Sequence, residues 1–451
     1  MCVLADTPAA QLLGGFKEGV GCAVSPCRSC DARQSDMAAI FTTAHCSMRD
    51  PEEHVNRIAH LSCQNRKGHK YWSKRWGITG PSVLAGIPGF DVTKCILHDP
   101  MHVILEGVAK VELKKMLNIF LFEKKYLTLE CLNRCIQQYN FSKAESKDKP
   151  EVIDKKALEP GSVFPQTAAC MKNLLINLPF IIGDHIPEDD EFWQNFIILL
   201  QILLLSITPV ISLNTADTLE ALVAKHNKNY VSLYSEESLT PKFHYLVHFS
   251  QQMRLFGPLR NHWCMRFESK NGFFKLQRWF NFINIPKSLS YYHQRWMCMQ
   301  MTQSSGRRSN VYLYAGDDVK NGPVCTVDSL FPLKEFLENS CAEVVLPQYV
   351  LCSPCVTVNG LSYEKGTVLL RSLAEGIELI EIEAVAVHEQ VKYLVCHKLH
   401  VTQFSSHRNA FAVEKTDNTC ILRVTDLQYP WPQVVHNEYV MLQNADDVWI
   451  L

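Results

Sequence analysis

The sequence lacks an excess of charge of either sign, with 45 Lys and Arg residues against 46 Asp and Glu residues and a net charge of −1. Any affinity for nucleic acid must therefore come from a local basic patch and not from the overall charge. No secretory signal is indicated, because Met1 to Gly15 has no basic start and Asp6 interrupts its apolar stretch. There is also no internal repeat at the period of a solenoid, which argues against repeat architectures.

Cysteines and long apolar runs are both sparse. Eighteen cysteines in 451 residues are too few for a fold held by disulfides, and their irregular spacing is typical of a reducing compartment. A close cysteine pair in that setting more often binds a metal ion. Phe196 to Leu213 comes nearest to a membrane span, but polar residues and Pro209 interrupt it. We therefore predict a buried helix there and no membrane partner.

What is present is the composition of a globular protein, since 47% of the residues are hydrophobic and only 20% are charged. From about Asp36 to Lys242, apolar residues recur at intervals of three and four. The recurrence is clearest in His102 to Phe122 and in Glu191 to Ser206, and it predicts helices. Between these two segments, the charged stretch Ser142 to Gly161 predicts a surface loop.

After about Ser309 the pattern changes to short strand-like runs. Val356 to Tyr363 alternates around Asn359-Gly360, which is a good signal for a hairpin turn. Five or more such strands in about 100 residues predict a small all-β, barrel-like domain. The predicted fold class is therefore α+β, mostly α. The further predicted strands are Gly366 to Leu370, Ile377 to Val387, Val391 to Val395, Ala410 to Val413 and Cys420 to Val424.

Two residue pairs have the spacing of metal ligands. Cys27 and Cys30 are spaced CxxC, which supplies half of a tetrahedral zinc site and requires a second pair. His244 and His248 are four residues apart, which on a helix directs both imidazoles to one face. Each pair taken alone is more often explained by packing or by a polar surface.

Shortly after His248 the sequence becomes strongly basic. Glu268 is the only acidic residue between Gln251 and Asn310. A single carboxylate in such a basic, aromatic-rich helix suits a metal-binding acid that faces a phosphate backbone. The alternative is a solvated basic face with one compensating Glu. The basic residues of this window are Arg254, Arg260, Arg266, Lys270, Lys275, Arg278, Lys287, Arg295, Arg307 and Arg308.

Taken in order, these motifs resemble the CACTA-type (EnSpm-like) DDE transposases, a clade related to the core of the V(D)J recombinase. The similarity covers about residues 1 to 300, and the blocks occur in the order of the family. The block around the family's second aspartate is matched by Asp6-Thr-Pro-Ala-Ala, Gly15-Phe16 and Cys27-x-x-Cys30. The family's D-x-M-H block is matched by His98-Asp-Pro-Met-His102 through Leu105-Glu-Gly107. The final block is matched by Pro241 to His248, Phe256 to Leu259 and Met265 to Glu268.

The resemblance implies that Asp6 is the second catalytic acid and Glu268 the third. It also implies that Cys27, Cys30, His244 and His248 hold a structural zinc ion that brings the two acids together. In the family, three carboxylates hold two Mg²⁺ ions for DNA cleavage and strand transfer. The first aspartate should lie on a strand well upstream of Asp6, which only five residues precede. We therefore expect this aspartate to be absent, and Mg²⁺ to act only if the triad is restored.

The same resemblance suggests how the chain is organised. Residues 1–35 would be a remnant of an RNase H-like core that carries the second aspartate and the CxxC pair. Residues 36–240 would form a large helical insertion, and residues 241–308 would carry the histidine pair and the basic helix with its Glu. Residues 309–451 would form the small β-rich domain.

Three motifs remain open to two interpretations. Asp99 and His102 could help to hold a metal ion or DNA, but Asp99 before Pro100 is also an ordinary helix start, which we favour. The basic and aromatic run Arg66 to Trp76 could contact DNA or form a solvated amphipathic helix. Cys352 and Cys355 could form a second zinc site with Cys396, His397 or His400, although cysteines on strands are more often packing residues.

The leading hypothesis is a transposase-derived nuclear protein that binds DNA and has no strand-transfer activity. One alternative is an active Mg²⁺-dependent transposase with a longer N-terminus, and another is a non-enzymatic module that binds other proteins. The expected partners are DNA and, in a homo-oligomer, further copies of the chain, with no small-molecule substrate. The residues predicted to contact DNA are Arg254, Arg260, Arg266, Lys270, Lys275 and Arg278.

Overall fold

The computed structural model describes residues 2–143, 145–235, 239–275, 284–303, 318–327, 333–335, 349–373 and 376–442. Arg278, Arg307 and Arg308, predicted above to be part of the basic segment, lie outside the described residues. The chain divides into two compact units, Met1–Ser269 with Ser406–Asn409, and Lys270–Ser405 with Ala410–Leu451. The predicted segments 1–35 and 36–240 thus belong to one unit, together with the histidine pair and Glu268.

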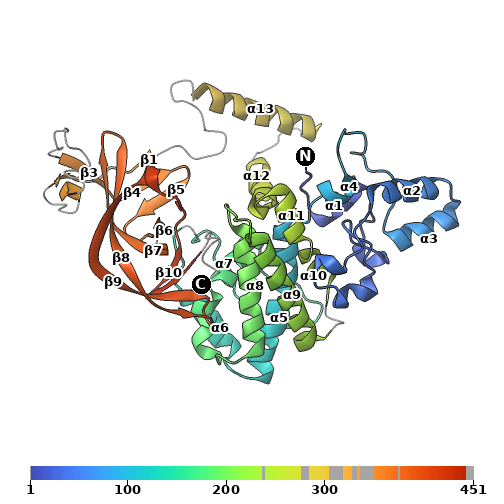
Figure 1. The fold of residues 1–451 in the computed structure, drawn as a ribbon, viewed down its shortest axis with the longest axis horizontal. Coiled ribbons are helices and arrows are strands. Elements are labelled where there is room, and N and C mark those ends of the chain that lie inside the picture. The colour runs from blue at the N-terminus through green and yellow to red at the C-terminus, as the bar shows by residue number, and fades with distance from the viewer. Residues whose placement is uncertain are drawn as a thin grey trace. The chain divides into compact units, whose positions relative to one another are not determined.

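The first unit is helical, as the periodicity of its apolar residues predicts (Figure 1). A π-helical stretch, Met101–Val108, continues directly into α5, and a second one, Ile119–Glu123, follows it. The α-helices are α1 (Thr7–Gly14), α2 (Pro51–Ser62), α3 (Arg66–Trp76), α4 (Val92–Cys95), α5 (Ala109–Asn118), α6 (Leu129–Gln138), α7 (Ala168–Ile182), α8 (Glu191–Ile207), α9 (Thr215–Tyr234), α10 (Pro241–Leu246) and α11 (Phe249–Phe256).

Helix α8 contains most of the apolar run that was predicted to be a buried helix, and the prediction is confirmed. Asp190 caps its first turn by accepting a hydrogen bond from the backbone N–H of Trp193 (2.9 Å). From Phe196 to Ile207 all residues but the half-buried Gln201 are buried. Within the part of the chain that the structure describes, no helix has the length and apolar character needed to span a membrane.

Extended pairing in the described part of this unit is limited to isolated bridges. Val3 pairs in parallel with Ile96, and its N–H donates to the carbonyl oxygen of Cys95 (2.7 Å). Two antiparallel bridges join Phe16 to Ile78 and Cys30 to Met48. The apolar start of the chain therefore lies beside the segment that leads into Asp99.

The second unit is a β domain that follows two helices. Asn359 and Gly360 adopt positive φ angles of 51° and 79°, as a type I′ hairpin turn requires, so the predicted hairpin is confirmed. The helices are α12 (Met265–Lys275), which begins in the first unit, and α13 (Ile285–Gln303). The strands are β1 (Asp318–Val319), β2 (Val324–Thr326), β3 (Tyr349–Ser353), β4 (Cys355–Val358), β5 (Leu361–Glu364), β6 (Val368–Leu373), β7 (Gly376–His388), β8 (Val391–Ser405), β9 (Ala410–Arg423), β10 (Val434–His436) and β11 (Tyr439–Met441).

These strands form an antiparallel sheet in the order β10-β11-β9-β8-β7-β3-β2, with β6 paired to β7, and a small sheet in the order β1-β4-β5. The α+β class is confirmed, but the described strands do not close into a barrel. Ala410 to Val413 and Cys420 to Val424, predicted as two strands, belong mainly to the single strand β9. The polar residues between them, all exposed except the half-buried Thr416, lie on a long β8–β9 ribbon and interrupt the apolar pattern of the strand.

Candidate metal centre

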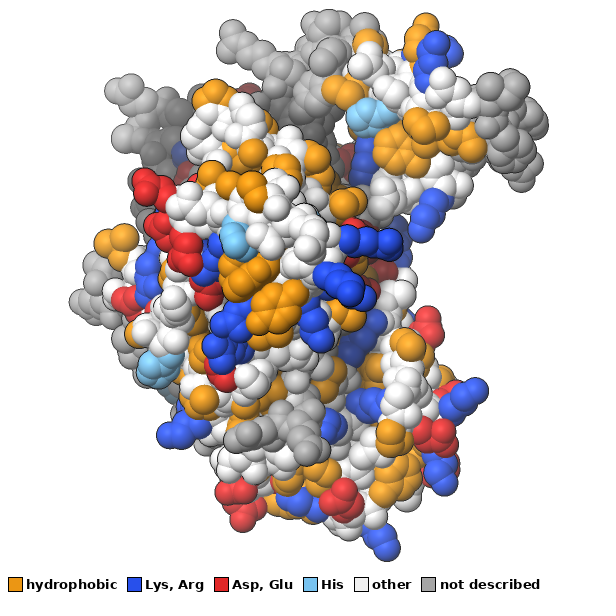
Figure 2. Space-filling view, turned by 90° about the vertical axis from the view of Figure 1, so that its right-hand side faces the viewer, with side chains coloured by type: hydrophobic (Ala, Val, Ile, Leu, Met, Phe, Trp, Pro, Cys, Tyr) orange, Lys and Arg blue, Asp and Glu red, His pale blue; other side chains and the backbone are white. Residues whose placement is uncertain are grey.

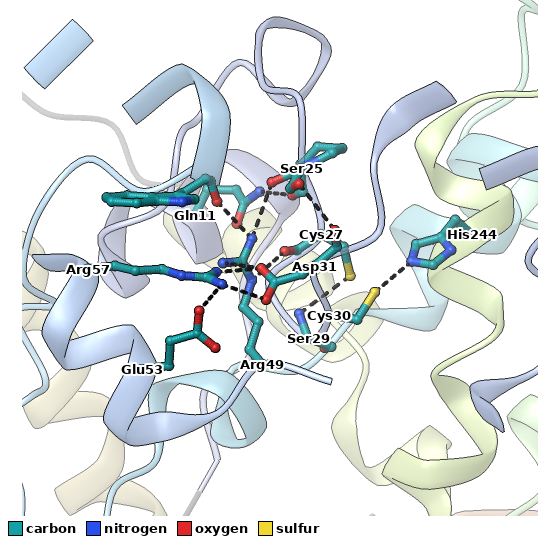
Figure 3. A network of polar contacts seen from close by, with 12 residues as sticks. Gln11, Ser25, Cys27, Ser29, Cys30, Asp31, Arg49, Glu53, Arg57 and His244 are labelled. Carbon is teal, nitrogen blue, oxygen red and sulfur yellow. Dashed lines mark hydrogen bonds and ion pairs between the residues drawn. The ribbon is translucent and has the colours of Figure 1, made fainter. Parts of the chain in front are cut away.

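The segment that carries Cys27 and Cys30 is irregular and is held in part by the buried guanidinium group of Arg49 (Figure 3). Arg49, which is 4% exposed, donates to the carbonyl oxygens of Cys27 (2.9 Å), Ser25 (3.2 Å) and Trp76 (2.8 Å). It also forms an ion pair with Asp31 (3.1 Å). A buried guanidinium is stable only when its N–H groups are paired in this way, so the network fixes the backbone around the two thiols.

The histidine pair comes from the junction of two helices. Pro241 occupies the first turn of α10, where its missing N–H leaves no helical hydrogen bond unmade. Helix α10 ends at Leu246, and His248 precedes α11 with a backbone that is still helical (φ −87°, ψ −5°). The predicted spacing therefore directs both imidazoles to one side, with 5.0 Å between their ring centroids.

The two pairs converge in one buried cluster, although more than 200 residues separate them in the sequence. Cys27 Sγ lies 3.3 Å from His248 Nε2, Cys30 Sγ lies 3.1 Å from His244 Nε2, and the two Nε2 atoms are 3.3 Å apart. All four side chains are at most 2% exposed. Around one tetrahedral ion with ordinary metal–sulfur and metal–nitrogen bonds, donors lie about 3.3 to 3.8 Å apart. The group, called the metal centre below, is therefore close to the geometry that holds a metal ion.

The protonation of the thiols also suits a cation. Burial alone raises the pKa of Cys27, but the hydrogen bond from Cys30 and the charge of His248 outweigh it and hold that pKa well below its ordinary value. The same hydrogen bond to Cys27 raises the pKa of Cys30. The thiolate is the form of cysteine that binds a metal ion, which would replace the thiol proton.

Two side chains beside the metal centre were missed by the sequence analysis. His98 is 1% exposed, stacks on His248 (5.5 Å between centroids) and lies 3.9 Å from Cys27 Sγ through Nε2. Burial, followed by the charge of Arg28, lowers its pKa to about 3. Cys46 lies close enough to hydrogen-bond Cys30, which lowers the pKa of Cys46. Neither stands at a short ligand spacing from Cys27 and Cys30, so no motif could have identified them.

Asp99 begins the helical segment in front of α5, as the favoured interpretation of Asp-Pro predicts. Its Oδ2 accepts the backbone N–H of His102 (3.1 Å) and contacts His102 Nδ1 (2.5 Å). Its Oδ1 accepts the backbone N–H of Cys264 (2.8 Å), at the start of α12. Asp99 therefore caps a helix and also orients the imidazole of His102, so the two interpretations are compatible.

The oriented imidazole of His102 faces two carboxylates. Its Nε2 lies 3.3 Å from Glu268 Oε1 and 3.8 Å from Glu106 Oε2. Burial lowers the pKa of His102, but the hydrogen bond to Asp99 and the charges of the two glutamates outweigh it and raise that pKa. The side chain of Glu268 is 48% exposed. Asp99, His102, Glu106 and Glu268 are called the acid–histidine cluster below. Its two glutamates reach solvent, whereas Asp99 is buried.

Asp6 lies near the same cluster. Val3 and Ile96 form a parallel bridge, and each is followed three residues later by an acid, Asp6 or Asp99. The two segments therefore run in the same direction from the bridge to the two acids. The pKa of Cys264 is raised to about 12, first by burial and then by the charges of Asp99, Glu268 and Asp6. Asp6 also caps α1 by accepting the N–H of Ala9 (2.8 Å). Asp6 and Glu268, which are 262 positions apart in the sequence, thus both raise the pKa of Cys264.

The predicted DNA-contacting residues have different surroundings. Arg254 forms ion pairs with Asp217 (2.5 Å) and Glu220 (2.9 Å). Arg260 is half-buried, and burial lowers its pKa. Lys270 stacks over the ring of Trp296, with its Nζ 3.7 Å from the centroid. Arg266 and Lys275 are exposed, whereas Arg278 lies outside the described residues. Arg254 and Lys270 are therefore partly committed to contacts within the protein.

Two other cysteine groups differ from the metal centre. Cys131 and Cys135 on α6 gather with His185, but Cys131 and Cys135 are only half-buried and His185 is exposed. In the β domain, Cys396 lies opposite Cys420 in the β8–β9 register, and Cys355 is buried in β4. Among the described residues of that domain, no three potential ligands come within metal-binding distance. The packing role considered for these cysteines agrees with this arrangement.

The chain was also compared with known proteins. No protein-family model matches it, and no curated protein is found to be similar. The function must therefore be inferred from the geometry and from the motifs of the chain itself.

Proposed function

We propose that this chain is a zinc-stabilised, transposase-derived protein that binds DNA. The observation that carries the proposal is the convergence of Cys27, Cys30, His244 and His248 in one buried group. These are the four positions that the resemblance to CACTA-type transposases assigns to zinc. A set of two thiolates and two imidazoles at tetrahedral spacing favours Zn²⁺ over Mg²⁺ or Ca²⁺, which prefer oxygen ligands.

The proposed zinc ion acts as a clamp. It joins the segment after α1 to the α10–α11 junction, and the segments next to these ligands carry Asp6 and Glu268. Because a structural zinc site contributes its binding free energy to folding, the clamp also stabilises the long helical insertion between the two ligand pairs. The convergence of Asp6, His102 and Glu268 near one side chain supports this arrangement.

The proposed DNA contacts use exposed cations that follow the metal centre. Arg266 and Lys275 on α12 are exposed, and Lys270 lies between them in the sequence. Contacts from such side chains to phosphates release counterions, so the affinity should fall steeply with salt.

A second candidate function is Mg²⁺-dependent DNA cleavage, and one observation favours it. Asp99 orients His102 toward Glu268, and Asp6 lies near enough for its charge to act on Cys264 in the same place. Oxygen-rich, solvent-open groups of this kind suit Mg²⁺. Under this candidate, Glu268→Gln would abolish cleavage of a DNA duplex in Mg²⁺, whereas the leading proposal assigns no cleavage to the 451-residue chain.

The leading proposal is tested by measuring the binding of a fluorescent DNA duplex to the full chain. Arg266→Glu, Lys270→Glu and Lys275→Glu together should abolish binding, because three favourable contacts become repulsive. The matched control reverses Lys155, Lys225 and Lys228, three exposed lysines of the helical unit, and should bind nearly as the unmodified chain does. Unchanged affinity in the first variant would instead support the protein-interaction alternative.

A further inference from the structure

We propose that the outward face of α3 binds the phosphate backbone of duplex DNA. This inference rests on the proposed function and adds to it a second surface, which lies about 200 residues before the basic segment around Glu268 in the sequence. It favours DNA contact over a merely solvated amphipathic helix as the interpretation of the run Arg66 to Trp76.

Helix α3 is positively charged along its whole length. It carries five Lys and Arg residues and no Asp or Glu, all five cations are exposed, and none forms an ion pair with another described residue. Figure 2 shows Lys and Arg side chains gathered around exposed hydrophobic side chains, on the side of the molecule where Figure 1 places α2 and α3. The five cations, called the α3 face below, are Arg66, Lys67, Lys70, Lys74 and Arg75.

Lys74 and Arg75 lie in the last turn, where the helix dipole favours cations, but the other three charges do not stabilise the helix. Arg66 and Lys67 lie in its first turn, where the positive end of the helix dipole repels cations. Arg66, Lys70 and Lys74 are spaced four apart, so each repels the next. Helix α2, in contrast, has the favourable arrangement, with Glu52 and Glu53 in its first turn. A polyanion bound along the α3 face would relieve both kinds of repulsion.

The opposite face of α3 fixes the helix in place without help from the cations. Trp72 and Trp76 stack on each other, with 4.6 Å between ring centroids and an interplanar angle of 25°. Both pack against the buried cluster of Phe16, Leu61 and Ile78. Because both tryptophans face inward, the α3 face lacks the broad apolar stripe with which a surface helix enters a membrane. A duplex backbone fits this surface better than a lipid bilayer does.

The spacing of the cations suits a regular row of phosphates. Residues four apart on a helix are separated by about 6 Å along its axis, and flexible lysine side chains can adjust that distance to successive phosphates. Tyr71, which is 60% exposed, lies between Lys70 and Lys74 in the sequence and can donate its hydroxyl hydrogen to a phosphate oxygen. Contacts of this kind do not distinguish base sequence, so the α3 face should bind duplexes of any sequence.

The test is the salt dependence of binding of the full chain to a DNA duplex, measured for the variant Lys67→Ala, Lys70→Ala, Lys74→Ala. The expected result is an affinity at least about tenfold lower and a salt slope that falls by up to about one for each lysine. Alanine favours helix at exposed positions, so the variant should fold. The matched control Lys155→Ala, Lys225→Ala, Lys228→Ala removes the same charge elsewhere and should keep both values.

The outcomes separate this inference from the proposed function. If the unmodified chain binds DNA and the α3 variant keeps its affinity and slope, the inference is overturned and the proposed function stands. If the unmodified chain does not bind DNA, both fail. Loss of binding to phosphatidylserine vesicles, with DNA binding unchanged, would assign the α3 face to lipid and overturn the inference. Lys70→Ala alone should lower the slope by about one, which provides a milder variant of the same test.

Discussion

The metal centre and the acid–histidine cluster are neighbours in the helical unit, but they differ in ligand chemistry and in exposure. The metal centre has two sulfur and two nitrogen donors and is at most 2% exposed. The acid–histidine cluster has oxygen donors around one imidazole, and the side chain of Glu268 is 48% exposed. A buried closed site can contribute only to structure, whereas an open one can exchange ligands with solvent or with DNA. We therefore expect the stability of the protein to depend mainly on the metal centre, and binding of ligands or DNA at the surface to depend on the acid–histidine cluster.

The largest effect should come from removing the thiols of the metal centre. Cys27→Ala with Cys30→Ala should lower the free energy of unfolding by more than about 4 kcal/mol. Two zinc ligands are lost, and with them the free energy of zinc binding that contributes to folding. Urea denaturation of the full chain measures this change. Cys131→Ala with Cys135→Ala is the matched control and should have a far smaller effect, since these thiols are half-buried. Equal losses in the two variants would remove the distinction between the groups.

The second effect concerns the support of the metal centre. Arg49→Met should destabilise the protein by about 3 kcal/mol, since it leaves three carbonyl oxygens without this donor. It should also weaken zinc binding, because the backbone around Cys27 is no longer fixed. Competition with a zinc chelator measures the affinity, and Arg57→Met, which removes only exposed or half-buried contacts of Asp31 and Glu53, serves as the comparison. Unchanged zinc affinity in Arg49→Met would show that the ligands hold their own geometry.

A smaller effect is expected at Asp99. Asp99→Ala removes the helix cap and the acceptor of the Cys264 N–H, and should cost about 1 to 2 kcal/mol. The zinc content should stay the same, because Asp99 belongs to the acid–histidine cluster and not to the metal centre. Thermal unfolding and metal analysis of the same sample check both statements. Loss of zinc in Asp99→Ala would mean that the two groups are not independent.

Glu268→Gln should have the smallest effect on stability, within about 0.5 kcal/mol, because the side chain is half-exposed. DNA binding should stay equal or become slightly tighter, because one negative charge near the phosphates is removed. The same change should lower the raised pKa of His102, which NMR titration can measure. Since that pKa is raised in the folded protein, the contact stabilises the fold fully below about pH 6.5 and is lost as the pH rises through the folded-state value. A His102 pKa unaffected by Glu268→Gln would contradict the assigned contact.

The sequence predicts the elements better than it predicts their association. Periodicity correctly located α8 and the β domain, and Asn359-Gly360 correctly located a hairpin turn, because these signals are local. It divided β9 into two strands, since the polar middle of that strand is exposed. The ligand pairs could be chosen from their spacing, but the roles of His98 and Cys46 depend on contacts between distant segments. For the same reason, the ion pairs that occupy Arg254 were not predictable.

The proposed zinc site is tested most directly by the metal content and ligand environment of the purified full chain, measured by elemental analysis and X-ray absorption at the zinc edge. We expect a zinc ion bound by two sulfur and two nitrogen atoms, which is lost in Cys27→Ala, Cys30→Ala and retained in Cys131→Ala, Cys135→Ala. Protein that contains no zinc, or whose zinc is unchanged when Cys27 and Cys30 are replaced, would contradict the proposed site.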